Sequence, residues 1–426
     1  MSVEVAIMSR EKFTEKFERL EEKWHLTLEK NRIKSVSFSR EVGRAVRVIV
    51  DGRVGFSSAV GASFEDIEKK AVELAKYGSE MNSFPEGGRR DVKVYDRRFE
   101  EVNAEFLKSL GERAVDSLKS GEIATGAIEI SRLRTRIENP SFCGEYEETS
   151  AFFFVEVIRS GSAYNYVQSR KVELDVEKVV EEAEELAEKP VESVSGKMRV
   201  VLSPMAFSQI VSHTLYPAFS AESVEKGRSR LSLGMEFGWE FEIFDDPTLD
   251  WGLSSYPFDD EGVKAGRRCL YSGGVRTLLS DWKFSGPSAP PGNAVREEST
   301  SYPSIAPSNV FFEFERMRDG VEESDALYVH CVAGAHTANP VSGDFSVECL
   351  NAFYRGKPSE QCSTVTFTPC SGKQSLRASP CKSTALWSAR FCLRRGLSGW
   401  FDHRFCFDLT SVFCLLIFTE FYYIII

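Results

Sequence analysis

The stretch RAVRVIVDGRVGFSSA (residues 44–59) constrains the fold of this chain more than any other. Val46, Val48 and Val50 occupy alternate positions, as in a strand that buries one face. Asp51-Gly52 follows them and suits a two-residue turn, because both residues tolerate positive φ angles. We therefore predict a β-hairpin here, as part of an antiparallel sheet near the N-terminus.

Helices and further strands are predicted on both sides of this hairpin. Apolar spacing predicts helices over residues 10–24, 63–77, 102–119 and 175–188. In the first of these, Phe13, Phe17 and Leu20 would share one face, and in the second, Ser63 and Asp66 form a variant of the capping box. Apolar segments rich in β-branched or aromatic residues predict strands over 124–139 and 147–161.

A composition change divides the chain in two. The segment KPVESVSGK (189–197) is typical of a linker, and a strand follows it at 197–202. Ser203-Pro204 then caps a helix over 204–215, which Pro217 would end. We predict an α+β fold, with an N-terminal domain (1–190) of antiparallel sheet with packed helices and a mostly-β C-terminal domain (197–354).

The last 72 residues differ from the rest. Residues 355–426 hold nine Lys and Arg against four Asp and Glu, a net of +5, which leaves −16 for residues 1–354 of a chain whose total is −11. They also hold six of the ten cysteines and show no apolar periodicity. We interpret residues 355–426 as an atypical tail that is non-native or disordered, and a frame error near residue 355 would explain it.

Charge and hydropathy argue against two classes of partner, nucleic acids and membranes. A net charge of −11 without a basic cluster argues against a nucleic-acid partner, since neutralising phosphates requires grouped Lys and Arg. The N-terminus lacks the apolar core of a signal peptide, and the apolar segment 411–426 contains Glu420 and is shorter than the roughly 20 residues of a membrane span. We expect a cytoplasmic protein without a membrane partner, and a tail anchor is the weaker alternative.

The predicted helix 204–215 carries a lone histidine, His213, on an apolar stretch. A zinc-binding helix needs two ligands about one turn apart, whereas Tyr216 and Pro217 stand at those distances from His213. An ordinary core or interface histidine is therefore the favoured interpretation.

Two further segments concentrate polar side chains. The segment 243–262 holds six carboxylates, which could perform acid–base work or bind a hard cation, but its Pro and Gly residues favour turns. The segment 329–347 holds His330 and Cys331, which face opposite sides of a strand and are poor co-ligands. Ser342, His336 and Asp344 could be written as a catalytic triad, but no nucleophile-elbow pattern supports one, so a binding loop is favoured.

Five segments in order resemble the TldD/PmbA family, and the last resembles its PmbA (TldE) branch. They are VRVIVDGRVGFSSAVGAS (46–63), IENPSFCGEYEET (137–149), KGRSRLSLGMEFGWEFEIFDDPTLDWGLSSYPFDDEGV (226–263), PPGNAV (290–295) and GAHTANPVSGDFSV (334–347). The resemblance spans roughly 30–354. The tail after Tyr354 departs from the family pattern, and the usual first helix is short or missing.

The resemblance implies the non-catalytic role in a two-subunit peptidase. In the TldD branch an HExxxH helix binds the catalytic zinc, and its positions fall here on Ser212, His213 and Pro217. The resemblance therefore implies no metal and no catalytic residue in this chain, and zinc in a TldD-like partner that forms a heterodimer with it. The implied substrates are peptides and unstructured protein segments. Candidate substrate- or interface-binding residues are His336, Thr337, Asn339, Ser342, Asp344, Asp259, Asp260 and Glu261.

Two other functions stay open. One is a self-sufficient metallopeptidase, in which His213, His330, Cys331 or His336 would converge on a metal. The other is a non-proteolytic regulatory protein, in line with the family's description as a modulator of DNA gyrase. A homodimer is the assembly left open for the isolated chain.

Overall fold

The computed structural model describes most of the first 354 residues and short parts of the remainder. The described residues are 12–188, 199–236, 241–314, 326–339, 341, 345–354, 357–358, 362–369, 390–392 and 422–425.

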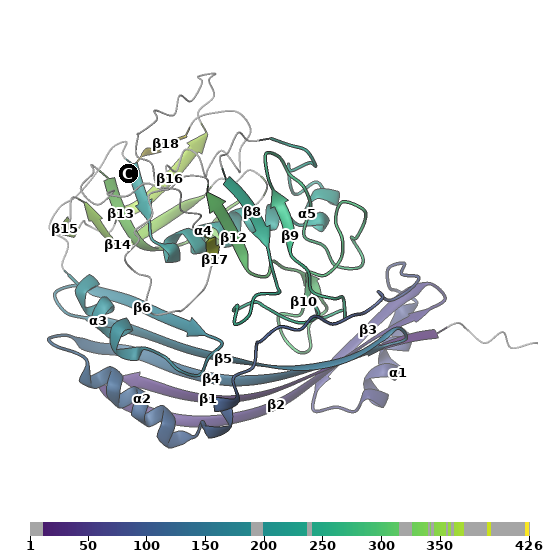
Figure 1. The fold of residues 1–426 in the computed structure, drawn as a ribbon, viewed down its shortest axis with the longest axis horizontal. Helices are drawn as coiled ribbons and strands as arrows, with labels where there is room; N and C mark the ends of the chain where they lie inside the picture. The colour runs from purple at the N-terminus through teal and green to yellow at the C-terminus, as the bar shows by residue number, and fades with distance from the viewer. Residues whose placement is uncertain are drawn as a thin grey trace, which may run out of the picture.

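A six-stranded antiparallel sheet, in the order β3-β2-β1-β4-β5-β6, forms the N-terminal part (Figure 1). Its strands are β1 (Lys12–Glu29), β2 (Arg32–Val50), β3 (Arg53–Val60), β4 (Glu122–Asn139), β5 (Phe142–Ile158) and β6 (Ser162–Ser169). The hairpin prediction is confirmed, because β2 and β3 meet at Asp51 and Gly52, whose φ angles are 52° and 75°. The four central strands have 17 to 19 residues and are thus roughly 60 Å long.

Helices pack on one face of this sheet. They are α1 (Phe64–Ala75), α2 (Ala104–Asp116) and α3 (Val176–Leu186), and a short 3-10 helix η1 (Arg97–Glu101) precedes α2. These helices match three of the predictions, and Ser63 caps α1 by accepting a hydrogen bond from the Asp66 amide at 3.2 Å. Leu26 and Leu28 of β1 lie in the hydrophobic core beneath α2 and α3.

The prediction of a helix over residues 10–24 is wrong, since residues 12–29 form β1 at the centre of the sheet. Side chains of a strand alternate between its two faces, and Leu26, which packs under the helices, has an even number. The odd-numbered residues Glu15, Phe17 and Arg19 therefore point to the sheet face opposite the helices. Because Glu15 and Arg19 are charged, the sequence does not show the alternation of apolar and polar residues that is typical of a strand. The spacing of Phe13, Phe17 and Leu20 therefore indicated a helix. Partners distant in sequence neutralise both charges, as described below.

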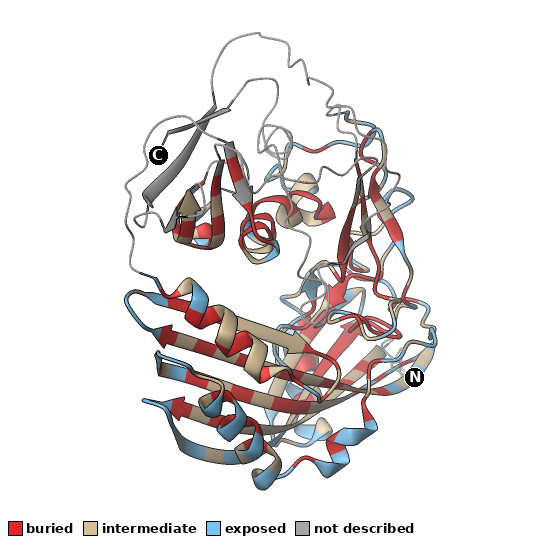
Figure 2. Ribbon diagram, turned by 60° about the vertical axis from the view of Figure 1, so that its left-hand side comes forward, coloured by how far each residue is buried: buried red, intermediate tan, exposed pale blue. Residues whose placement is uncertain are grey.

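The C-terminal part lies over the other face of the N-terminal sheet and is built mainly of short strands (Figure 1). Its elements up to residue 354 are β7 (Arg199–Leu202), α4 (Pro204–Ala218), α5 (Ala221–Glu225), β8 (Phe241–Asp245), β9 (Arg268–Tyr271), β10 (Ala294–Val295), β11 (Ser304–Ile305), β12 (Val310–Phe314), β13 (Ala326–Ala333), η3 (Ala335–Thr337) and β14 (Ser346–Tyr354). One hydrophobic core joins α4 to the sheets that contain β12-β8-β9 and β14-β13-β7. Figure 2 shows this core as buried segments on both sides of α4. The predicted α+β class is confirmed.

Within the described residues of the predicted tail there are four short strands: β15 (Lys357–Pro358), β16 (Cys362–Pro369), β17 (Arg390–Cys392) and β18 (Tyr422–Ile425). β16 pairs antiparallel with β14 and extends that sheet. The remaining residues of 355–426 lie outside the described part of the chain. The interpretation of 355–426 as non-native or disordered, like the domain boundaries at 190 and 197, stays a prediction.

Within the described stretches, no helix is both long and apolar enough to cross a membrane.

Candidate functional site

Helix α4 is the element that the sequence singled out. The Ser203 hydroxyl caps it by accepting a hydrogen bond from the Ala206 amide at 3.0 Å, and Pro204 follows as the first helical residue. Its buried face enters the core shared by the C-terminal sheets. The helix continues to Ala218 rather than ending before Pro217. Pro217 has no N–H to donate to the His213 carbonyl, and the helix ends one residue later.

The three positions of α4 that correspond to the zinc helix do not form a ligand set. The Ser212 hydroxyl donates to the Gln209 carbonyl at 3.0 Å, so it bonds back to its own helix. His213 is exposed, and Pro217 carries no side-chain donor atom. A catalytic zinc needs three protein ligands, whereas this helix offers one imidazole, so these residues do not fit the zinc that the resemblance places on the corresponding helix of the TldD branch.

No other group of metal ligands occurs in the part of the chain that the structure describes. In those stretches, no three His, Cys, Asp or Glu side chains converge closely enough to hold an ion. His330 and Cys331 lie in β13, where Cys331 Sγ is 3.8 Å from the Leu350 carbonyl oxygen. Burial lowers the pKa of His330 to about 4 and raises the pKa of Cys331 to about 11. Both side chains are therefore neutral near pH 7.

The predicted binding loop lies next to α4. The short helix η3 follows Gly334, whose φ of 84° favours glycine, and the Thr337 hydroxyl donates to the Gly334 carbonyl at 2.8 Å. Ala335 anchors the loop in the same core as α4, while His336, Thr337 and Asn339 are exposed. The structure thus places these three candidates on one surface loop. Ser342 and Asp344 lie outside the described residues.

The candidate Glu261 is buried between the two parts of the chain. Arg47 of β2 donates to Glu261 Oε1 at 2.6 Å and to both oxygens of Glu15 at 2.7 Å. All three side chains are at most 1 % exposed. The second Glu261 oxygen accepts the Trp282 amide at 2.7 Å. Two carboxylates and one guanidinium are removed from water together here. Loss of any one of them would leave a buried charge without its partner, so the stability of this contact depends on all three.

Asp260 extends the same network. Its two oxygens accept hydrogen bonds from Arg19 Nη2 at 2.9 and 3.0 Å, and one of them also accepts the Arg296 amide at 2.6 Å. The Arg296 side chain is buried and reaches Glu15 at 3.3 Å. Burial, followed by the charge of Arg47, lowers the pKa of Arg296 to about 10. Arg296 nevertheless remains charged at neutral pH.

Asp259 forms a turn, in agreement with the favoured interpretation of segment 243–262. Its oxygens accept the amides of Glu261, Val263 and Ala294 at 3.0, 2.9 and 3.0 Å. Burial, followed by the charge of Glu261, raises the pKa of Asp259 well above its usual range. Asp246 forms a similar turn by accepting the Thr248 amide at 2.8 Å.

Sequence reasoning missed the arginine side of this network. Arg47 occupies the position between Val46 and Val48, and an alternating strand pattern assigns such a position to solvent. Here both faces of the strand are covered: the valines pack on α1, and Arg47 faces the C-terminal part. An arginine inside the otherwise apolar run 45–50 was the available signal.

The chain is similar to known proteins over most of its length. The family description "PmbA/TldA metallopeptidase C-terminal domain" matches residues 195–369, and "PmbA/TldA metallopeptidase domain 1" matches residues 21–76. Protein MJ0231 of Methanocaldococcus jannaschii is 30% identical over 327 residues, which cover 73% of this chain and 77% of that protein. A protein named Metalloprotease from Archaeoglobus fulgidus is 24% identical over 75% of this chain and 80% of its own length.

A solved structure shares the fold. TldE from Thermococcus kodakarensis superposes with a TM-score of 0.73 at 23% identity, over 83% of this chain and 87% of that one. The chain belongs to the TldD/PmbA family of metallopeptidases and their relatives.

Proposed function

We propose that this chain is a TldE-like, non-catalytic subunit of a TldD/TldE-type peptidase complex. A TldD-like partner would carry the zinc and hydrolyse peptides and unstructured protein segments. One observation carries the proposal: at the three metal-helix positions, Ser212 bonds to its own helix, His213 is exposed and Pro217 has no ligand atom. Hydrolysis with a helix of this kind requires a metal supplied by another subunit.

The loop that carries His336, Thr337 and Asn339 is our candidate for contact with peptide or partner. Its exposed polar side chains lie beside α4, the element that bears the metal in the catalytic branch, and this position supports the assignment. We include Ser342 and Asp344 in the same loop on the basis of sequence. Polar loops held on a rigid core are common binding surfaces.

Asp259, Asp260 and Glu261 have a positioning role in this proposal. Their bonds to Arg19, Arg47 and backbone amides fix the C-terminal part on the N-terminal sheet, which would hold the wall of a substrate chamber. We place the complex in the cytoplasm. Cys143, Cys269, Cys331 and Cys349 are free thiols, which supports a reducing compartment.

Co-purification with a TldD-like protein tests this function. We expect one peak of higher mass on size exclusion of the mixture at micromolar concentration, and peptidase activity that chelation removes. His213→Ala in this chain should leave that activity within about twofold, because an exposed, non-ligating side chain contributes little. Two separate peaks would contradict the proposal. So would near-stoichiometric zinc in the isolated chain together with activity that disappears on chelation.

A further inference from the structure

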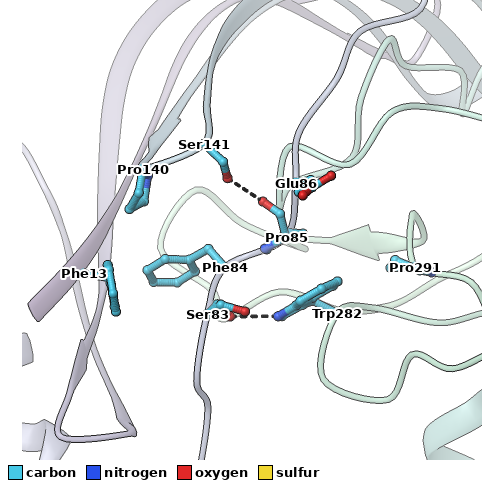
Figure 3. A pocket seen from close by; sticks show the side chains of 9 residues that line it. All are labelled: Phe13, Ser83, Phe84, Pro85, Glu86, Pro140, Ser141, Trp282 and Pro291. Atoms are coloured by element: carbon cyan, nitrogen blue, oxygen red, sulfur yellow. Dashed lines mark hydrogen bonds between the residues drawn. The ribbon is translucent and has the colours of Figure 1, made fainter. Parts of the chain in front are cut away.

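A cavity of about 470 Å³ opens where the N-terminal sheet meets the C-terminal part. Nine residues line it: Phe13, Ser83, Phe84, Pro85, Glu86, Pro140, Ser141, Trp282 and Pro291. In Figure 3, Phe13 and Pro140 lie at one end, Phe84 and Pro85 in the middle, and Trp282, Glu86 and Pro291 at the other end. Its volume is within the range of roughly 300–1,000 Å³ that is usual for ligand pockets.

The wall of this cavity is fixed by contacts between distant segments. Trp282 Nε1 donates to the Ser83 carbonyl at 2.7 Å, and the Ser141 hydroxyl donates to the Pro85 carbonyl at 2.9 Å. Pro140 and Ser141 belong to the segment IENPSFCGEYEET, and Pro291 belongs to PPGNAV. Two segments that the α4 site leaves unused therefore meet here.

The polar groups of the wall leave one carboxylate unpaired. The hydrogen bonds just described occupy the Trp282 indole and the Ser141 hydroxyl. Glu86 is the only charged residue of the nine, and its exposed carboxylate has no hydrogen-bond or ion-pair partner in the described stretches. A ligand would therefore meet aromatic rings, proline rings and one negative charge.

Arginine is the side chain whose chemistry matches this combination. Its aliphatic stem packs on apolar rings, its planar guanidinium stacks on aromatic faces, and its paired N–H groups match a carboxylate. The protein already makes such a contact at this wall, because Arg47 Cζ lies 5.4 Å from the centre of the Phe84 ring. Glu15 and Glu261 neutralise Arg47, so it does not repel a second cation. The excess of negative charge in residues 1–354 also favours a basic ligand.

We propose that this cavity binds an arginine side chain of an extended peptide, with the guanidinium on Trp282 and Glu86 and the stem along Phe84 and Pro85. The inference rests on the proposed function and deepens it, because it names peptides that contain arginine as the preferred substrate class. It assigns no catalytic step to the cavity.

Titration calorimetry with short capped peptides tests the proposal on the full chain. The probes are acetyl-Ala-Ala-Arg-Ala-Ala-amide and the same peptide with citrulline, a neutral side chain of nearly equal shape. We expect the arginine peptide to bind with a Kd of about 1 mM or tighter, and the citrulline peptide to bind about tenfold more weakly. Glu86→Gln should weaken the arginine peptide about threefold and leave the citrulline peptide unchanged.

Two variants complete the design. Trp282→Leu should weaken both peptides, since it removes stacking surface, and Glu112→Gln, an exposed carboxylate on α2, should change neither. Absence of binding at about 5 mM peptide, equal affinity for arginine and citrulline, or an unchanged affinity in Glu86→Gln would overturn the inference. Association with a TldD-like partner is measured separately by size exclusion, so its failure is distinguishable from failure of this site.

Discussion

Asp281 provides a stability prediction whose size depends on pH. This side chain is 5 % exposed and accepts one backbone hydrogen bond, from the Phe284 amide at 3.0 Å. Burial, followed by the charge of Glu261, raises the pKa of Asp281 to about 6, compared with about 3.9 in an unfolded chain. The folded state therefore binds more protons between these values, and stability falls as the pH rises through this window.

The size of the effect follows from the shift in pKa. Two pKa units correspond to about 3 kcal/mol, which is the full cost of ionised Asp281 above pH 6. Asp281→Asn removes the charge and retains the oxygen that accepts the Phe284 amide, but its new amide group needs a partner. We therefore expect a gain in the free energy of unfolding of about 1–3 kcal/mol at pH 7.5 and almost none near pH 4.

Urea denaturation of the variant and the parent chain at pH 7.5 and near pH 4 measures this gain. Asp91→Asn is the control, because Asp91 is exposed and should produce the same small change at both pH values. A loss of stability at pH 7.5, or an equal gain at both pH values, would refute the assignment of a raised pKa to Asp281.

Three further predictions concern buried charge and the sheet edge. Arg47→Leu leaves Glu15 and Glu261 buried without their cation and should cost about 3–5 kcal/mol in chemical denaturation, whereas the exposed Arg136→Leu should cost less than about 0.5 kcal/mol. His330, with its pKa lowered to about 4, binds fewer protons in the folded than in the unfolded state, so the stability that it contributes is lost as the pH falls from about 6.5 to 4. His330→Gln should reduce this loss of stability by about 2–3 kcal/mol in acid titrations. An unchanged titration would contradict the lowered pKa. Ending the chain at residue 354 removes β16 and exposes the edge of β14, so light scattering should detect aggregates, and a monodisperse truncated protein would show that β16 does not protect this edge.

Local chemistry made much of the fold predictable. Asp51-Gly52 specified a hairpin, and Ser63 and Ser203 marked helix starts, because each of these features acts within four residues of itself. The strand β1 was misread, since the charges of Glu15 and Arg19, which face the C-terminal part, are explained only by partners at Arg47 and beyond residue 259. A period of two cannot be recognised where charged residues take positions that face the interior.

The candidate site was predictable to a smaller extent. The missing ligands at Ser212 and Pro217 follow from residue identity alone, and the neighbouring loop around His336 follows from its Gly-rich composition. The cavity that contains Glu86 and Trp282 was not predictable, because its wall combines residues from five separate segments. Its shape depends on how the two parts of the chain meet, which no local pattern encodes.

The Arg47–Glu261 bond has a consequence for biosynthesis. These residues are 214 positions apart in the chain. At about 5–20 residues per second, a ribosome needs roughly 10–40 s to make that interval. During this time the nascent sheet presents an uncovered, partly charged surface, which a chaperone could shield until its cover emerges.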